Sequence, residues 1–321
     1  MRNSVRNFCI CLFLFTFLIA VGVVPAQQQS GKDLSWAFLV ADKNLPPDDT
    51  SGTLKHVPGS SKAYTMVQID DLANPPDWFP DEHPAPPNVV LHGEGSVLAC
   101  GSCHLMSGLG HPESADLAGL PATYIERELT DFKSGDRKDP ANRMNGFSKG
   151  LSDEEIKQVS EWFAALKPAP WVKVVEADTV PKTWINKGRM RLPIPGGGTE
   201  PLGDRIIELP QDPARVDTRD PHSGFVAYVP FGSLAKGEKL AATGEAGKTI
   251  QCAICHGEGL TGLGDVPKIA GLSAVYIVRQ LYGFKNGVRD GNSAALMKGV
   301  VAKLSDDDII ALAAYVASQK P

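Results

Sequence analysis

Apolar side chains recur at helical spacing in two segments that lie far apart in the chain. In residues 122–133, and again in residues 274–285, apolar and aromatic positions follow the pattern i, i+4, i+5 and i+8. This spacing places them on one face of an α-helix. Each segment is therefore predicted to be an amphipathic helix with one buried face.

A second pair of helices is predicted towards the end of each half. Ser152 with Glu155, and Ser305 with Asp308, form capping boxes that open these helices. Apolar residues then follow at helical spacing, so each helix has a face to bury. The expected buried stripes are Ile156, Val159, Phe163 and Leu166 in the first helix, and Ile309, Leu312 and Val316 in the second.

These helices belong to an internal repeat, which predicts two tandem helical domains at residues 92–168 and 235–321. Each unit has ~80 residues, which is small for a purely apolar core, so a buried prosthetic group would help to fill it. The matching positions are Tyr124 and Tyr276, Leu129 and Leu281, Phe132 and Phe284, Gly135 and Gly287, Arg137 and Arg289, Leu151-Ser152-Asp153 and Leu304-Ser305-Asp306, and Trp162 and Tyr315.

Two segments interrupt the helical pattern. Residues 27–91 are rich in proline but hold several aromatic side chains, so we expect an irregular segment that packs onto a helical domain. Residues 169–234 also carry many prolines, which exclude long helices. Short β-prone runs at 171–175, 205–209 and 225–229 predict a loop-and-strand segment lying across both domains. The fold class is thus mainly α, with short β structure between and before the two domains.

The first 26 residues are predicted to be a secretory signal peptide. Arg2 and Arg6 precede an apolar run from Phe8 to Val24, and Val24-Pro25-Ala26 offers small residues for cleavage. The run is at the short edge of a membrane span, so an uncleaved anchor is the alternative. Four cysteines remain outside this leader.

Those four cysteines form two copies of the pentapeptide C-x-x-C-H. They are Cys100, Cys103 and His104 in the first unit, and Cys252, Cys255 and His256 in the second. The motif is the attachment sequence of c-type haem, in which two thiols bind the vinyl groups and the histidine ligates the iron. Zinc or a redox dithiol would also use C-x-x-C. Two copies that each carry a histidine, far apart in the chain, favour two covalently bound haem c groups.

A methionine recurs at the same place in both units and is the candidate for the second iron ligand. Met144 and Met297 each precede the Leu-Ser-Asp helix start by 7 residues, on what we expect to be a loop between helices. A thioether ligand favours Fe(II) and raises the potential. Met190 has no counterpart in the other unit and is assigned to core packing.

Composition and charge narrow the functional class. The chain is 42% hydrophobic and 21% charged, with a formal net charge of −5. These values are ordinary for a globular protein, and no basic stripe predicts nucleic-acid binding. The acidic excess lies in residues 27–168, whereas residues 235–321 are slightly basic. The two units could therefore meet different redox partners, or the charges could merely keep the surface soluble.

Both units resemble class I cytochrome c domains, and the pair is similar to the di-haem cytochrome c4 and c553 group. The first unit shares Ala118-Gly119-Leu120, Tyr124, Gly135, Arg137 and Met144 with the pattern, and the second shares Ala270-Gly271-Leu272, Tyr276, Gly287, Arg289 and Met297. The resemblance implies that a proline carbonyl orients each haem histidine. Pro267 fits that role in the second unit, and Ala115 stands at the aligned position in the first.

The sequence therefore predicts a periplasmic di-haem cytochrome that passes single electrons between redox protein partners and is not itself an enzyme. Each iron is expected to have one histidine and one methionine ligand. Two alternatives stay open: a cytochrome subunit of a dehydrogenase or oxidase complex, and a di-haem peroxidase. The membrane would be met only through a retained leader or through docking to a membrane complex.

Overall fold

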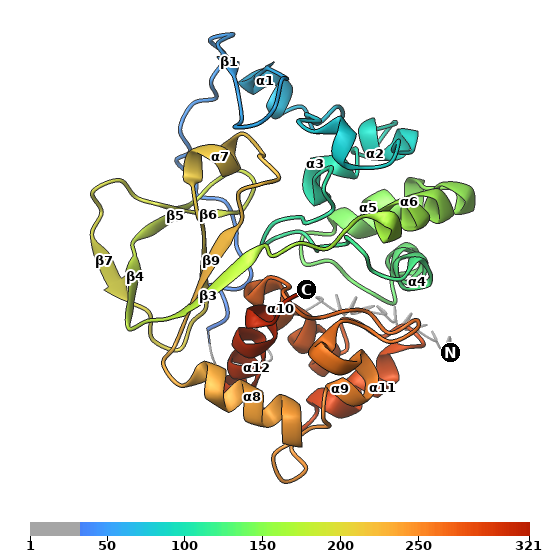
Figure 1. Cartoon of the computed structure of the whole chain (residues 1–321), viewed down its shortest axis with the longest axis vertical. Coiled ribbons are helices and arrows are strands. Elements are labelled where there is room, and N and C mark those ends of the chain that lie inside the picture. The colour runs from blue at the N-terminus through green and yellow to red at the C-terminus, as the bar shows by residue number, and fades with distance from the viewer. Residues whose placement is uncertain (1–32) are drawn as a thin grey trace, which may run out of the picture.

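The computed structural model describes residues 33–321, so the predicted leader with Cys9 and Cys11 lies outside the described residues. Two helical units lie one above the other, and a layer of short strands flanks both of them (Figure 1). The first unit contains α3 (Gly101–His104), α4 (Ala122–Ser134), α5 (Arg143–Gly150) and α6 (Asp153–Ala165), and α2 (Asn88–Leu91) at the end of the N-terminal segment packs against α6. The second contains α8 (Ser233–Thr243), α9 (Ala253–His256), η3 (Glu258–Leu260), α10 (Ala274–Lys285), α11 (Ala294–Val301) and α12 (Asp306–Ser318).

The four helices predicted from the apolar pattern are confirmed. Helices α4 and α10 cover the two amphipathic segments, and α6 and α12 begin directly after Ser152 and Ser305. Each serine hydroxyl accepts a hydrogen bond from the backbone N–H three residues later. The carboxylates of Glu155 and Asp308 in turn accept the backbone N–H of Ser152 and Ser305, so both capping boxes form. Local sequence thus sets where these helices start.

Helix α8 was not predicted from the sequence, and it packs along α12. Gly237 makes this approach possible: a Cβ atom there would lie 2.0 Å from the carbonyl oxygen of Ala311. The helix therefore needs glycine at the crossing point, although glycine lowers helix propensity by about 1 kcal/mol. Packing against α12 in the second unit offsets that loss.

The segment between the units forms the strand layer. The three predicted β-prone runs become β3 (Val172–Glu176), β8 (Ile207–Pro210) and β9 (Phe225–Val229) in one sheet, ordered β3-β9-β8. Strands β3 and β9 are parallel, and β8 and β9 are antiparallel. The remaining elements are β4 (Thr179–Pro181), β5 (Thr183–Ile185), β6 (Arg191–Pro193), β7 (Thr199–Pro201) and α7 (Pro213–Asp217), with β4 pairing β7 and β5 pairing β6.

This layer joins two apolar cores. Ala227 and Val229 of β9 are buried in the core of the second unit, whereas Trp171 and Phe225 are buried in that of the first. The N-terminal segment is divided in the same way. It contains β1 (Leu54–Lys55), β2 (Tyr64–Thr65), α1 (Met66–Ile69) and η2 (Pro80–Glu82); Leu34 and Trp36 before these elements join the second core, and Val89 joins the first. Both segments therefore contact both units, although the N-terminal segment was expected to pack onto only one of them.

A buried carboxyl group fastens β8 to α10 and makes stability depend on pH. Glu208 accepts hydrogen bonds from the Ser273 hydroxyl (2.7 Å) and the Val275 N–H (3.2 Å), and burial raises its pKa from 4.5 to about 7. Because the folded-state pKa is raised, the neutral acid stabilises the fold fully below the unfolded value near 4.5. That contribution is lost as pH rises through 7.

We expect the free energy of unfolding to fall by on the order of 3 kcal/mol between pH 5 and pH 8 through this group. Glu208→Gln keeps the side-chain size and removes the ionisation, so its loss over the same range should be smaller by that amount. Urea unfolding of both proteins at the two pH values measures the difference. If both proteins lose the same unfolding free energy between pH 5 and pH 8, Glu208 does not titrate in this range.

Candidate haem sites

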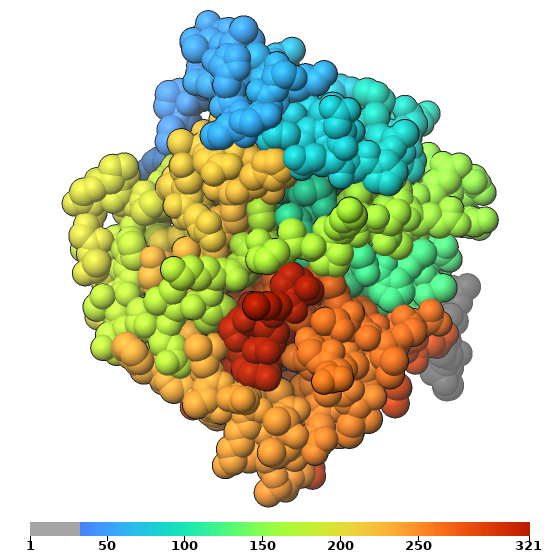
Figure 2. Space-filling model, in the orientation of Figure 1, coloured from blue at the N-terminus to red at the C-terminus, as the bar shows by residue number. Residues whose placement is uncertain are grey.

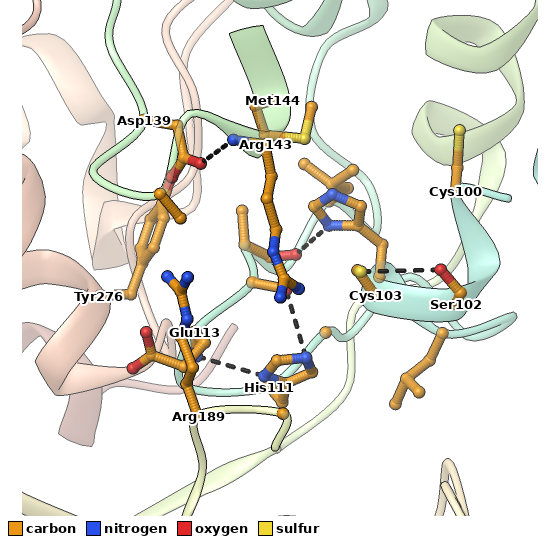
Figure 3. A pocket seen from close by; sticks show the side chains of 18 of the residues that line it. Cys100, Ser102, Cys103, His111, Glu113, Asp139, Arg143, Met144, Arg189 and Tyr276 are labelled. Atoms are coloured by element: carbon orange, nitrogen blue, oxygen red, sulfur yellow. Dashed lines mark hydrogen bonds between the residues drawn. The ribbon is translucent and has the colours of Figure 1, made fainter. Parts of the chain in front are cut away.

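The first C-x-x-C-H motif forms one helical turn beside a large cavity. Cys100 precedes α3, and Cys103 and His104 lie within it, so the two thiols are a single turn apart. Both cysteines, His104 and Met144 line a cavity of about 1030 Å³ (Figure 3). Its walls include apolar side chains from α4 and α6, among them Ile125, Leu129 and Phe163. Such a cavity, apolar with two thiols and a histidine at one end, fits a porphyrin.

His104 is held in the tautomer that a metal needs. Its Nδ1 donates to the carbonyl oxygen of Ala115 at 2.8 Å, so Nε2 keeps its lone pair. Burial also lowers the pKa of His104, which keeps the ring neutral. The aligned position in the second unit is a proline, but the contact uses the backbone carbonyl, which every residue type supplies. Ala115 therefore performs the orienting role that the family resemblance assigns to proline.

Burial disfavours the thiolate form of the first cysteine of each motif. Burial raises the pKa of the Cys100 thiol to about 12 and that of Cys252 to about 11. A buried thiolate is therefore disfavoured at both positions, whereas a thioether carries no charge and costs nothing of this kind to bury. All four cysteines of the described residues are free of disulfides.

Met144 enters the same cavity from another element. It is the second residue of α5, half-buried, and Figure 3 shows its side chain and that of Cys103 on different walls of the cavity. The expectation of a loop position was wrong for both methionines, because Met297 lies within α11. Each of these helices has only 8 residues and connects two longer helices.

The second motif has the same arrangement. Cys252 precedes α9, which holds Cys255 and His256, and the His256 Nδ1 donates to the carbonyl oxygen of Pro267 at 2.8 Å. Burial lowers the pKa of His256 as it does for His104. Met297 is half-buried and packs against the core of the second unit. Cys255 is exposed, whereas Cys103 is half-buried, so the two turns differ in their surroundings.

An ion pair joins the residues that follow the two orienting carbonyls. Lys268 Nζ lies 2.7 Å from Asp116 Oδ2, and both side chains are buried. Asp116 follows Ala115, and Lys268 follows Pro267, so the pair connects the supports of the two histidines. A pseudo-symmetric cluster lies nearby between α4 and α10. It comprises Tyr124, Glu128, Arg137, Tyr276, Gln280 and Arg289.

The segment between the units was expected to lie across both of them, but the sequence did not indicate which of its residues would line the first cavity. Arg189, Met190 and Arg219 line it from the region between the units, and His111 lines it from the first unit itself. None of these has a counterpart in the second unit, so the repeat carries no signal for them. His83 and His92 pair with Asp77 and Asn74.

Within residues 33–321, no three His, Cys, Asp or Glu side chains come close enough together to hold a metal ion. Among the helices of this part of the chain, none combines the length and the apolar character that crossing a membrane would require.

Comparison with known proteins agrees with this geometry. The model of the family "Cytochrome c" matches residues 234–320. A thiosulfate dehydrogenase electron acceptor of Thiomonas intermedia is 28% identical over 228 residues, which cover 70% of this chain and 79% of that protein. Cytochrome c4 of Stutzerimonas stutzeri is 26% identical over 237 residues, covering 70% and 86% of the two chains. Cytochrome c-554(548) of Halomonas halodenitrificans is 41% identical over 81 residues, which cover 25% of this chain and 96% of that protein.

Proposed function

This chain belongs to the cytochrome c family as a di-haem, cytochrome c4-like electron-transfer protein with two covalently bound haem c groups, and from this premise we propose which residues hold them. Cys100 and Cys103 attach the first haem, and His104 and Met144 ligate its iron. Cys252 and Cys255 attach the second, and His256 and Met297 are its ligands. The units that hold them are residues 92–168 and 235–321.

One observation carries this proposal: the same arrangement occurs twice. At each site a cysteine precedes a one-turn helix that ends in histidine, and the Nδ1 of that histidine donates to a backbone carbonyl at 2.8 Å. A half-buried methionine on the short helix before the capping box completes each set. A redox dithiol would not need a histidine with a fixed tautomer, and a structural zinc site needs four ligands close together, whereas no three His, Cys, Asp or Glu side chains of residues 33–321 come close enough to hold a metal ion.

The protein contributes orientation and a shielded environment. When bound, haem supplies an iron that cycles between Fe(III) and Fe(II). The carbonyls of Ala115 and Pro267 fix the rings of the two histidines and keep their Nε2 atoms free of protons. The apolar walls around His104 exclude water, which favours the less charged reduced state.

We further propose a periplasmic location and a dehydrogenase as the electron donor. The location is supported by the predicted leader at residues 1–26, because c-type haem is attached outside the cytoplasmic membrane. The donor is supported by the relative named as a thiosulfate dehydrogenase electron acceptor. The segments 27–91 and 169–234 would then supply surface that is specific to this chain.

Mass spectrometry of the exported protein tests the assignment. We expect the chain cleaved after Ala26 plus the mass of two haems. The variants C100A/C103A and C252A/C255A should each lose one haem, because a thioether cannot form without its thiol. C9A/C11A is the matched control and should keep both, since these cysteines lie in the predicted leader.

The contrary result is also well defined. A double-cysteine variant that keeps both haems, or a wild-type protein that carries zinc in place of haem, would refute the proposed attachment residues. Co-purification of a dehydrogenase with the wild-type protein would identify the donor independently of haem content.

A further inference from the structure

The two attachment turns differ sharply in how much of them is exposed. Ser102 and Ile254 occupy the same position of the motif, immediately before the second cysteine. Ser102 is 1% exposed and Ile254 is 62% exposed. The outer face of the first turn is therefore covered by protein, and that of the second faces solvent. This difference in exposure does not arise from the turns themselves, because both motifs form the same short helix.

Residues 72–90 of the N-terminal segment cover the first turn from one side. Backbone N–H groups of Ala99 and Cys100 donate to the carbonyls of Leu72 and Val89 at 3.1 Å each. At Gly101, a Cβ atom would lie 2.6 Å from the sulfur of Met106, 3.0 Å from the Val90 oxygen and 3.5 Å from the Pro75 ring. A larger residue at this position would have to displace the Met106 side chain and would press on the Val90 carbonyl, whereas the second motif has Ala253 here.

Residues 215–222 of the segment between the units complete the cover. Arg219 donates from Nη1 to the carbonyl oxygen of Ser102. The two covering pieces are also bonded to each other. The Trp78 indole N–H donates to the Thr218 oxygen at 2.9 Å, and His222 Nε2 lies 2.8 Å from a Glu82 carboxylate oxygen. In Figure 2 the surfaces of the two segments, cyan and gold, meet over this end of the molecule. We call residues 72–90 and 215–222 the cap.

The second turn instead presents apolar side chains to solvent. Ile250 is 51% exposed and Leu263 is 60% exposed, like Ile254 next to the second thioether position. Leu263 lies against Gly257, which directly follows His256. Residues 250–257 contain no Lys, Arg, Asp or Glu. Single exposed apolar residues are normal on protein surfaces, but a group of them beside a cofactor attachment turn marks an interaction site.

We propose that redox protein partners exchange electrons with this cytochrome only at the second site, across the surface that carries Ile250, Ile254 and Leu263, because the cap covers the attachment turn of the first site. The inference rests on the proposed haem attachment. In each exchange the partner loses one electron and the second site gains it, or the reverse; the first site is reached through the second. The fitting partner is a redox protein with an uncharged, apolar surface around its own cofactor, since the turn offers no charge to pair with.

This proposal departs from the expectation based on overall charge, in which each unit meets its own partner. Net charge over a whole unit steers association at a distance, but contact requires an open surface. The first unit has the acidic excess and the cap, whereas the second has the open attachment turn. The second-order rate constant for electron exchange with a matching partner should therefore change by less than about twofold between 20 and 300 mM salt.

Hydroxyl-radical footprinting of the holo-protein tests the closure without any partner. Leu105 directly follows the first motif and is 9% exposed, whereas Leu263 lies seven residues after His256 in the second unit. We expect Leu263 to be oxidised several-fold faster, because oxidation rates follow solvent exposure and Leu263 is 60% exposed. A blue copper protein with an apolar copper face should then protect Ile254 and Leu263. Equal oxidation of the two leucines in the free protein would overturn the proposal.

Stopped-flow oxidation by the same copper protein tests the exchange surface. Ile254→Glu places a charge in the proposed contact and should slow the reaction about tenfold. Leu54→Glu is the matched control: Leu54 is 56% exposed on the N-terminal segment, and its variant should react like wild type. If the two variants react equally fast, the surface is not used. Loss of a haem or of the methionine–iron absorption band in wild type would instead refute the attachment proposal, so the two failures are distinguishable.

Discussion

Replacing Met297 with alanine is expected to lower the potential of one haem by roughly 0.1–0.3 V, within the ~0.8 V range that axial ligation spans. The physical reason is that a thioether stabilises Fe(II) better than water or an open position does. Met144→Ala should have the same effect on the other haem. The thioether–iron charge-transfer band of the oxidised protein should lose about half its intensity in each variant, and a redox titration reports the potentials.

A methionine from the same cavity provides the control. Met190 lines the first cavity with Met144, but it comes from the segment between the units and has no repeat counterpart. Met190→Ala should keep the full band and shift the potentials little, because it removes packing and not a ligand. A band that survives intact in both Met144→Ala and Met297→Ala, or that disappears in Met190→Ala, would show that the ligands were assigned wrongly.

The helices could be predicted because their signals are local. The capping boxes at Ser152 and Ser305 involve contacts within one turn, and the apolar stripes repeat with the helical period. The three β-prone runs were also found as strands, although their pairing was not predictable from composition. The internal repeat provided evidence that local patterns do not contain, because Met144 and Met297 became candidate ligands only by occupying the same position in both units.

The cap and α8 could not be predicted because both depend on contacts between distant parts of the chain. Trp78 donates to a carbonyl 140 residues away, and nothing near Trp78 in the sequence announces that partner. Gly237 looks unfavourable for a helix until α12 is seen against it. Ala115 shows a different limit: a backbone carbonyl performs the orienting role, so the side chain that the family pattern uses is not required.

The buried pair between Lys268 and Asp116 belongs to the same class of long-range contact, and its removal should have a large effect on stability. Lys268→Met is expected to lower the free energy of unfolding by about 3–5 kcal/mol, because Asp116 would remain buried without a counter-charge. Asp116 already has a raised pKa, since burial outweighs the lysine. Urea unfolding at pH 7 measures the loss.

Two further variants separate charge from packing. Lys187→Met removes an ion pair with Asp48 and Asp70 whose lysine side chain is 49% exposed, so the expected loss is at most about 1 kcal/mol. Lys268→Met with Asp116→Asn should recover much of the stability, because asparagine can still accept the Ala118 N–H without burying a charge.

The pH dependence of the stability lost in Lys268→Met shows whether the buried charge of Asp116 causes the loss. Without Lys268 the folded-state pKa of Asp116 rises further above its unfolded value. The neutral acid is then tolerated, so the stability deficit of Lys268→Met should be largest at pH 8 and should shrink as pH falls towards 4–5. The double variant has no carboxylate at 116 and should show no such recovery. If Lys268→Met costs no more than Lys187→Met at any pH, the link between the two histidine supports is not an energetic one.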